Sequence, residues 1–193
     1  MPVGRRDVLK LAAASIATAL GVPLAGCPRA HTGTRTAARR REVEMNTRTL
    51  MVVRIVAAQP HALGAGPHGT RLTFPITGGD FDGPRLRGRV LGGGGDWGVV
   101  RSDGVLELSL RATLETDDGA LIGLTFDGMR HGPPEVIAAL GRGETVDPAA
   151  YYFRTVPRFE AADERYAFLN RIVAVGRGEN RATGAVHTFH EVL

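Results

Sequence analysis

The sequence predicts a single all-β domain, an antiparallel closed β-barrel with one short helix. From Leu50 onward, short apolar runs are separated by Gly, Asp and Pro at the spacing typical of antiparallel strands. Only residues 133–140 read as a helix, with prolines in the first turn and Gly141 just beyond the end. About nine strands favour a closed barrel because closure removes exposed sheet edges. A two-sheet sandwich is the alternative.

The expected strands are 50–58, 69–76, 85–91, 97–101, 104–115, 120–128, 150–160, 165–176 and 184–192. Alternation is clearest in 104–115, where four leucines and an alanine share one face and polar residues such as Glu107 and Arg111 share the other. Asp117-Asp118-Gly119 predicts a hairpin turn, because Asp and Gly tolerate the positive φ that such turns require.

The N-terminal residues 1–27 read as a twin-arginine-type lipoprotein signal. Arg5-Arg6 precedes an uncharged stretch, which ends in Leu24-Ala25-Gly26-Cys27. Lipidation of Cys27 would anchor an exported protein, since the apolar stretch is too short to span a membrane. Residues 28–47 would be a flexible linker and residues 48–193 the barrel domain. Translation from Met45 is the alternative and would leave a cytoplasmic protein.

Charge and cysteine content exclude several functions. The net charge of +4 lies in the leader, because sixteen arginines and seventeen acidic residues follow from Met45 onward. Nucleic-acid binding needs a concentrated positive face and is not expected. Cys27 is the only cysteine, so the domain has no disulfide or cysteine metal site.

No metal or cofactor is expected either. His187 and His190 fall on opposite faces of a strand, which is wrong for a shared metal, and we expect the histidines at the surface or in loops. The Gly-rich run at 93–98 satisfies G-x-G-x-x-G, but a strand follows it where a dinucleotide site needs a helix.

Several segments together resemble the bacterial and fungal family catalogued as domain of unknown function 3237, also designated UPF0311. They are Gly78–Val90, Gly95-Asp96-Trp97, Thr116–Ala120, Tyr151–Thr155, Pro157-Arg158-Phe159 and Tyr166–Asn170. The resemblance covers nearly all of residues 48–193. It implies a barrel like those of allene oxide cyclase and dirigent proteins, with a central cavity, and it implies no particular activity.

Polar and aromatic side chains supply a candidate site if they point into that cavity. Tyr152 and Arg154 share one face of their strand, and fixed donors in an apolar shell would hold a carbonyl or carboxylate. The expected ligand-binding residues are Arg71, Trp97, Arg111, Asp118, Arg154, Tyr166 and Asn170, with Asp96 and Tyr152 as tentative catalytic residues. The alternative is that these polar faces point to water while the apolar faces fill the barrel.

The leading functional hypothesis is binding of a small apolar or aromatic molecule that bears a carbonyl or carboxylate. A cofactor-free isomerase, cyclase or lyase is the rival, with Asp96 or Tyr152 moving the proton and Arg154 and Arg111 stabilising negative charge. A solid barrel that forms homo-oligomers through an outer apolar face is the third. The sequence leaves open whether any reaction is catalysed.

The export hypothesis makes a prediction about the native N-terminus. If the signal functions, the intact mass of the protein from its native host should correspond to a chain that begins at a lipid-modified Cys27. Mass spectrometry of the intact protein measures this directly. A native chain that begins at Met45 would contradict export.

Overall fold

The computed structural model describes residues 44–193. The predicted signal, the lipidation site at Cys27 and the linker up to residue 43 lie outside these residues, so export and lipidation stay predictions. Within the described part of the chain, no helix has both the length and the apolar character that crossing a bilayer requires.

The described residues form ten strands, one α-helix and two 3₁₀ helices. In chain order they are β1 (Thr47–Ala57), β2 (His61–Gly66), β3 (Gly69–Asp82), β4 (Arg87–Val90), β5 (Gly95–Val100), β6 (Leu106–Thr116), β7 (Leu121–His131), α1 (Pro134–Gly141), η1 (Pro148–Ala150), β8 (Tyr152–Ala161), η2 (Glu164–Arg171), β9 (Ala174–Arg181) and β10 (Gly184–Val192).

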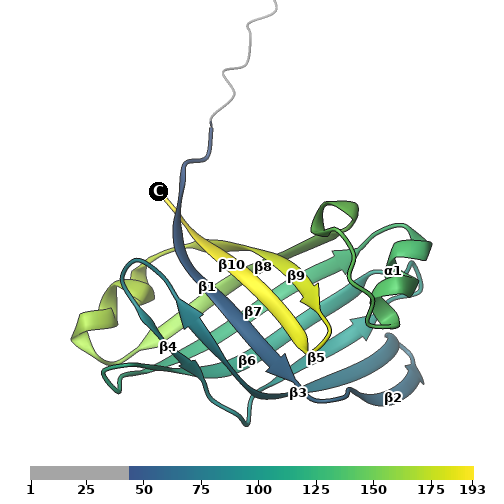
Figure 1. The fold of residues 1–193 in the computed structure, drawn as a ribbon, viewed down its shortest axis with the longest axis horizontal. Coiled ribbons are helices and arrows are strands. Elements are labelled where there is room, and N and C mark those ends of the chain that lie inside the picture. Colours follow the sequence, from purple (N-terminus) through teal and green to yellow (C-terminus); the bar gives the residue numbers. More distant parts are fainter. Residues whose placement is uncertain (1–43) are drawn as a thin grey trace, which may run out of the picture. The chain divides into compact units, whose positions relative to one another are not determined.

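The strands form the predicted antiparallel closed barrel (Figure 1). The wall runs in the order β1-β10-β9-β8-β7-β6-β4-β3, and β3 then pairs with β1 to close it. Two strands are additional: β5 pairs with β3 and β6, while β2 pairs with β3 alone in an extended hairpin.

Apolar side chains point into the interior, as the alternation within strands dictates. In β6, Leu106, Leu108 and Leu110 are buried, and the intervening residues are half-buried or exposed. Helical segments cover the two ends of the barrel, α1 at the right of Figure 1 and the yellow-green η2 at the left. Leu140 of α1 and Leu169 of η2 both belong to the buried core. These buried side chains form the core of the barrel.

Two local predictions are also wrong. Residues 165–176 were expected to form one strand, but they form η2 followed by the start of β9. The Asp163 side chain accepts a hydrogen bond from the Arg165 backbone N–H and so caps η2. Tyr166 and Leu169, three residues apart, then point together into the core, which matches the three-residue turn of a 3₁₀ helix.

The second error concerns the segment that contains His61 and His68. No strand was expected between residues 58 and 69, but residues 61–66 form β2, which pairs with an extended β3. Strand β3 continues through Gly78 and Gly79 to reach β1. A Cβ at Gly79 would lie 2.0 Å from the Arg54 carbonyl oxygen, and its φ of 143° favours glycine. Glycine here allows the approach that closes the barrel.

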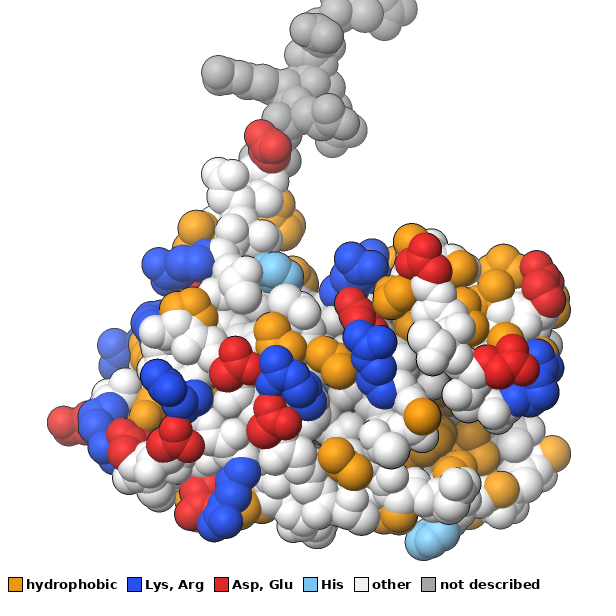
Figure 2. All heavy atoms as spheres, in the orientation of Figure 1, with side chains coloured by type: hydrophobic (Ala, Val, Ile, Leu, Met, Phe, Trp, Pro, Cys, Tyr) orange, Lys and Arg blue, Asp and Glu red, His pale blue; other side chains and the backbone are white. Residues whose placement is uncertain are grey.

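Ion pairs across neighbouring strands reinforce the outer wall. On the face shown in Figure 2, basic and acidic side chains are interspersed. Arg54 Nη1 of β1 lies 2.6 Å from both Asp80 Oδ1 and Asp82 Oδ1 of β3, at the junction that closes the barrel. Arg89 of β4 pairs in the same manner with Glu115 of β6.

Close packing of β9 against β8 predicts a strong cost for adding one methyl group. A Cβ at Gly178 would lie 2.6 Å from the buried Phe153 ring, so Gly178→Ala should destabilise the barrel by about 1–3 kcal/mol. Gly123→Ala is the matched control, because its Cβ would meet neighbours at 3.6 Å or more. Urea unfolding of both variants measures the difference, and equal stabilities would contradict this packing.

Candidate functional site

Most of the predicted site residues lie on the outside of the barrel. In β8, Phe153 and Thr155 are buried, whereas Tyr152 is 45% exposed and Arg154 is exposed. Trp97 of β5 and Arg111 of β6 are exposed in the same manner. The expectation that these side chains line a central cavity is therefore wrong. Their strands turn the alternate, apolar residues inward, which leaves the polar and aromatic ones facing solvent.

Four of the predicted residues nevertheless meet on the outer surface. A hollow of about 890 Å³ crosses the outer face of β5–β10, and Arg71 of β3 contributes to one side of it. We call it the outer groove. Its lining includes arginines, aromatic side chains and a methionine, namely Arg71, Trp97, Met129, Tyr152, Arg154 and Arg177.

The strand register places several of these side chains in one transverse row. Register partners in an antiparallel sheet lie side by side on the same face. Successive pairings from β3 to β9 connect Arg71, Val99, Glu107, Met129, Arg154 and Arg177. The row thus carries Arg71 at one end and the adjacent Arg154 and Arg177 at the other, with two apolar side chains and one acidic side chain between them.

The arginines of the groove have no acidic partner. Within residues 44–193, Arg71, Arg154 and Arg177 form no ion pair, and Arg154 Nη1 donates a hydrogen bond to the Phe153 carbonyl at 2.9 Å. Glu107 forms its ion pair with Arg101, whose Nη1 lies 3.1 Å from Glu107 Oε1. The groove therefore presents guanidinium groups that are free to bind an anion.

Two aromatic rings flank these charges. Tyr152 stacks on His131 with ring centroids 4.8 Å apart and an interplanar angle of 19°, and the Arg154 guanidinium carbon lies 5.1 Å from its centroid. The Trp97 indole is 41% exposed, and a Cβ added at Gly95 would lie 3.2 Å from it. Local contacts thus orient both rings, and much of their surface stays exposed in the groove.

Arg111 lies beside the groove and does not line it. Its guanidinium carbon lies 5.7 Å from the Trp97 ring centroid, and its register partner on β5 is Gly95. Arg111 therefore contacts the Trp97 indole from outside the outer groove and helps to orient it.

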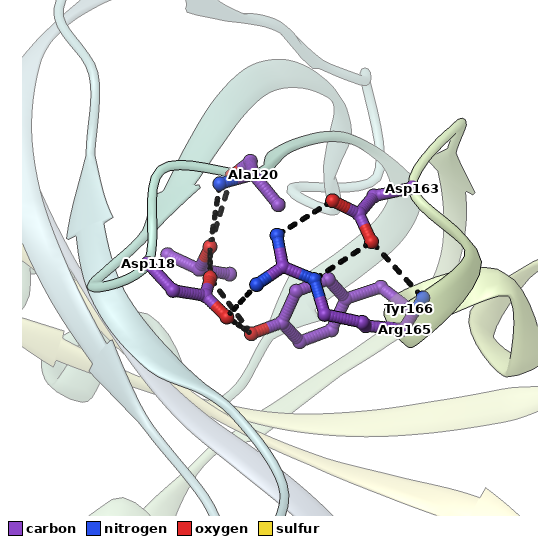
Figure 3. A network of polar contacts seen from close by, with 6 residues as sticks. Asp118, Ala120, Asp163, Arg165 and Tyr166 are labelled. Atoms are coloured by element: carbon purple, nitrogen blue, oxygen red, sulfur yellow. Dashed lines mark hydrogen bonds and ion pairs between the residues drawn. The ribbon is translucent and has the colours of Figure 1, made fainter.

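Asp118 and Tyr166 belong to a separate polar network (Figure 3). The Tyr166 hydroxyl lies 3.0 Å from both carboxylate oxygens of Asp118, and Arg165 Nη1 donates to Asp118 Oδ2 at 2.6 Å. The hydrogen bond from the Thr116 hydroxyl lowers the pKa of Asp118, and the Tyr166 bond adds to this effect. The network ties the β6–β7 turn to η2 and lies apart from the residues of the outer groove.

Asn170 makes two backbone contacts that end β8. Its Nδ2 donates to the Ala161 carbonyl at 2.7 Å, and its Oδ1 accepts from the Ala161 N–H at 2.8 Å. These bonds satisfy both the N–H and the C=O of Ala161, so the role of Asn170 is structural. The structure does not bring Asn170 to the groove.

Four polar residues lie inside the barrel, and two of them, Arg130 and Thr155, were not identified from the sequence. We call Asp96, Arg130, Thr155 and His187 the interior polar cluster. Thr155 and His187 are each 2% exposed, and Asp96 is 9% exposed. Among the described residues, Arg130 Nε, Thr155 Oγ1 and His187 Nδ1 are buried without a hydrogen-bond partner. The expected surface position of His187 is therefore wrong.

Burial controls the ionisation of this cluster. It raises the pKa of Asp96 to about 6, against the opposing hydrogen bond from the Ser109 N–H. It lowers the pKa of His187 to about 4, since the ring lies between Phe126 and Phe153 with centroid distances of 4.8 and 5.1 Å. Burial also lowers the pKa of Arg130. Both Asp96 and His187 thus favour their neutral forms inside the barrel.

The alternation of inward and outward positions along each strand predicts the burial of Arg130 and His187. Arg130 lies on the same face of β7 as the buried Ile122, Leu124 and Phe126, and His187 shares its face of β10 with Phe189. Among residues 44–193, no group of three or more His, Cys, Asp or Glu side chains is arranged to hold a metal ion.

The structure does not assemble the predicted catalytic set. Asp96 points into the barrel, whereas Arg154 and Arg111 point outward from the same wall. The backbone of the sheet therefore separates the buried carboxyl group from the guanidinium groups that were expected to act with it. Tyr152 is the only one of the two tentative catalytic residues that lies in the outer groove.

The raised pKa of Asp96 predicts a pH-dependent stability difference. The folded protein keeps this carboxyl protonated up to about pH 6, whereas the unfolded chain ionises near its usual value of 3.8. Stability due to the neutral carboxyl is therefore present below pH 4 and is lost as pH rises through 6. Between pH 4 and 7, the free energy of unfolding of Asp96→Asn should therefore rise relative to that of the natural protein, by up to roughly 3 kcal/mol.

Urea unfolding at several pH values measures this difference. His187 titrates in both proteins, so its contribution to the pH dependence of stability cancels when one stability-versus-pH curve is subtracted from the other. A stability difference that stays constant from pH 4 to 7 would contradict the buried, neutral Asp96.

Comparison with known proteins identifies the family. The family model described as a protein of unknown function (DUF3237) matches residues 45–192. A UPF0311 protein from Rhodopseudomonas palustris is 39% identical over 147 residues, which cover 75% of this chain and 96% of that protein.

Solved structures of similar proteins share the fold. A conserved protein of unknown function from Rhodopseudomonas palustris superposes with a TM-score of 0.76 at 34% identity, covering 78% of this chain and 99% of the other. A beta-barrel like protein from Acinetobacter baumannii gives a TM-score of 0.69 at 36% identity, covering 80% and 100%. The resemblance seen in the sequence motifs is confirmed: this chain belongs to the DUF3237 family.

Proposed function

We propose that the outer groove binds a small aromatic molecule that carries a carboxylate. This is the ligand class expected from the sequence, placed on the outer face of the barrel in place of a central cavity. The single observation that carries the proposal is the row of arginines without acidic partners beside two exposed aromatic rings. Volumes of several hundred Å³ are typical of small-molecule sites, and about 890 Å³ lies in that range.

The arginines account for the carboxylate. Arg154 and Arg177 are register partners on β8 and β9 and face outward together. Like charges directly opposite in a sheet destabilise it, so an anion between them removes a repulsion as well as forming hydrogen bonds. Guanidinium groups match the planar geometry of a carboxylate, with two parallel donors for its two oxygens.

The apolar lining accounts for the aromatic part. Trp97, Met129, Tyr152, Val156 and Val175 are all exposed and all line the groove. An aromatic ligand would cover these side chains and stack against the oriented Tyr152 or Trp97 ring. A carboxylate without an apolar body would leave this surface in water.

The geometry removes Asp96 from the enzyme hypothesis. A cofactor-free isomerase, cyclase or lyase needs a proton acceptor that faces its substrate. Asp96, the carboxyl group with the raised pKa, lies on the inner face of the wall. Within the groove, Tyr152 is held by His131 on one side and Arg154 on the other, which suits a ligand platform.

Calorimetry on the full chain with biphenyl-4-carboxylate and its amide tests the proposal. The acid should bind, and the amide should bind at least about tenfold more weakly, since it lacks the charge that the arginines recognise. Arg154→Gln should weaken binding of the acid by about tenfold or more, equivalent to about 1.4 kcal/mol.

Arg158→Gln is the matched control. Arg158 is an exposed, outward-facing arginine of the same strand that does not line the groove, so this variant should bind as the natural protein does. Equal affinity for acid and amide, or an unaltered affinity in Arg154→Gln, would refute the proposal. A stable dimer in analytical ultracentrifugation that dissociates on Val156→Asp would do the same, because the groove would then be a contact between copies.

A further inference from the structure

Among the neighbouring strands of the barrel wall, β8 and β9 share the fewest register pairs. These two strands pair only at Arg154↔Arg177 and Thr155↔Gly176. By contrast, β7 and β8 pair without interruption from Ile122↔Ala161 to His131↔Tyr152. We call the two pairs between β8 and β9 the β8–β9 seam.

On the inner face, β9 brings only small residues to this seam, and the Phe153 ring of β8 packs over Gly178. The inward positions of β9 include Ala174, Gly176 and Gly178, so the strand contributes no large apolar side chain to the core there. Thr155, the seam residue on β8, keeps its buried Oγ1 without a hydrogen-bond partner among the described residues. Strand pairs with few ladder bonds open at a lower free-energy cost than fully paired ones.

The outer face of the seam carries a repulsion where other strand pairs carry an attraction. Arg48 faces Glu191 across β1 and β10, Arg54 faces Asp80 across β1 and β3, and Arg89 faces Glu115 across β4 and β6. All three pairs form ion pairs of 2.6 Å. At the β8–β9 seam, one arginine faces another arginine.

We propose that an anionic group bound between Arg154 and Arg177 closes the β8–β9 seam, so that ligand binding in the outer groove is coupled to closure of the barrel wall. The inference rests on the proposed function for its occupant, a carboxylate. Bridging the two guanidinium groups replaces their repulsion by charge-assisted hydrogen bonds to both strands. The bound carboxylate then takes the place that acidic residues hold at the other strand pairs.

This placement also orients the ligand. With the carboxylate at the seam, its apolar and aromatic neighbours include Tyr152 and Met129, on the side of the groove that leads toward Trp97. By linkage, a ligand that binds the closed seam more tightly than the open one stabilises the closed form.

Hydrogen–deuterium exchange of the full chain, with and without saturating biphenyl-4-carboxylate, tests the coupling. The ligand should slow exchange of β8 and β9 amides by about tenfold or more, corresponding to about 1.4 kcal/mol, and should leave the β6–β7 ladder unaltered. Unaltered exchange in β8 and β9, with the groove saturated, would overturn the inference.

Arg177→Glu supplies the acid that the seam lacks. This variant should slow exchange at the seam without any ligand, and biphenyl-4-carboxylate should add no further protection. Arg158→Glu, on the same outer face of β8 but away from the seam, is the matched control and should exchange as the natural protein does. If Arg177→Glu does not fold, Arg177→Gln removes the repulsion alone and should show a smaller slowing. Exchange as fast as in the natural protein would overturn the inference.

The two proposals fail in different ways. If calorimetry shows binding but exchange at the seam does not slow, the groove binds its ligand and the coupling is wrong. If biphenyl-4-carboxylate does not bind and Arg177→Glu still slows exchange, the proposed function is wrong. The coupling of ligand binding to closure is then wrong as well.

Discussion

Closure of the sheet through the pairing of β1 with β3 is the constraint on which the rest of the structure depends. Once the wall is closed, each strand has one face that must be buried and one that meets solvent. The apolar residues occupy the buried face, as Leu106, Phe126 and Phe189 do. The polar and aromatic side chains of neighbouring strands consequently gather outside, and the outer groove is a product of this division.

The interior polar cluster is the exception to this division, and burial defines its chemistry. Removing Asp96 and His187 from water favours their neutral forms, which raises the pKa of Asp96 and lowers that of His187. Arg130 cannot become neutral and instead lies next to Asn180, to which its Nη1 donates a hydrogen bond. These groups lie behind the wall that carries the groove, so the two sites have different environments although they share strands.

Charge placement on the outer wall links stability to the proposed binding. Exposed ion pairs contribute little each, yet their arrangement is informative, since acids face arginines at three strand pairs and an arginine faces an arginine at the β8–β9 seam. The seam is also where β9 brings glycine to the interior. Weak joining and unpaired positive charge thus coincide at the position where the groove would hold its anion.

The sequence by itself determined the fold class, the family and most strand positions, because period-two alternation and turn residues are local signals. It also drew attention to Arg71, Trp97, Tyr152 and Arg154, which the structure brings together. Only the tertiary structure decided that these side chains face outward and that residues 164–171 form a 3₁₀ helix. Alternation separates two faces of a strand, but which face is enclosed depends on closure between strands far apart in the chain.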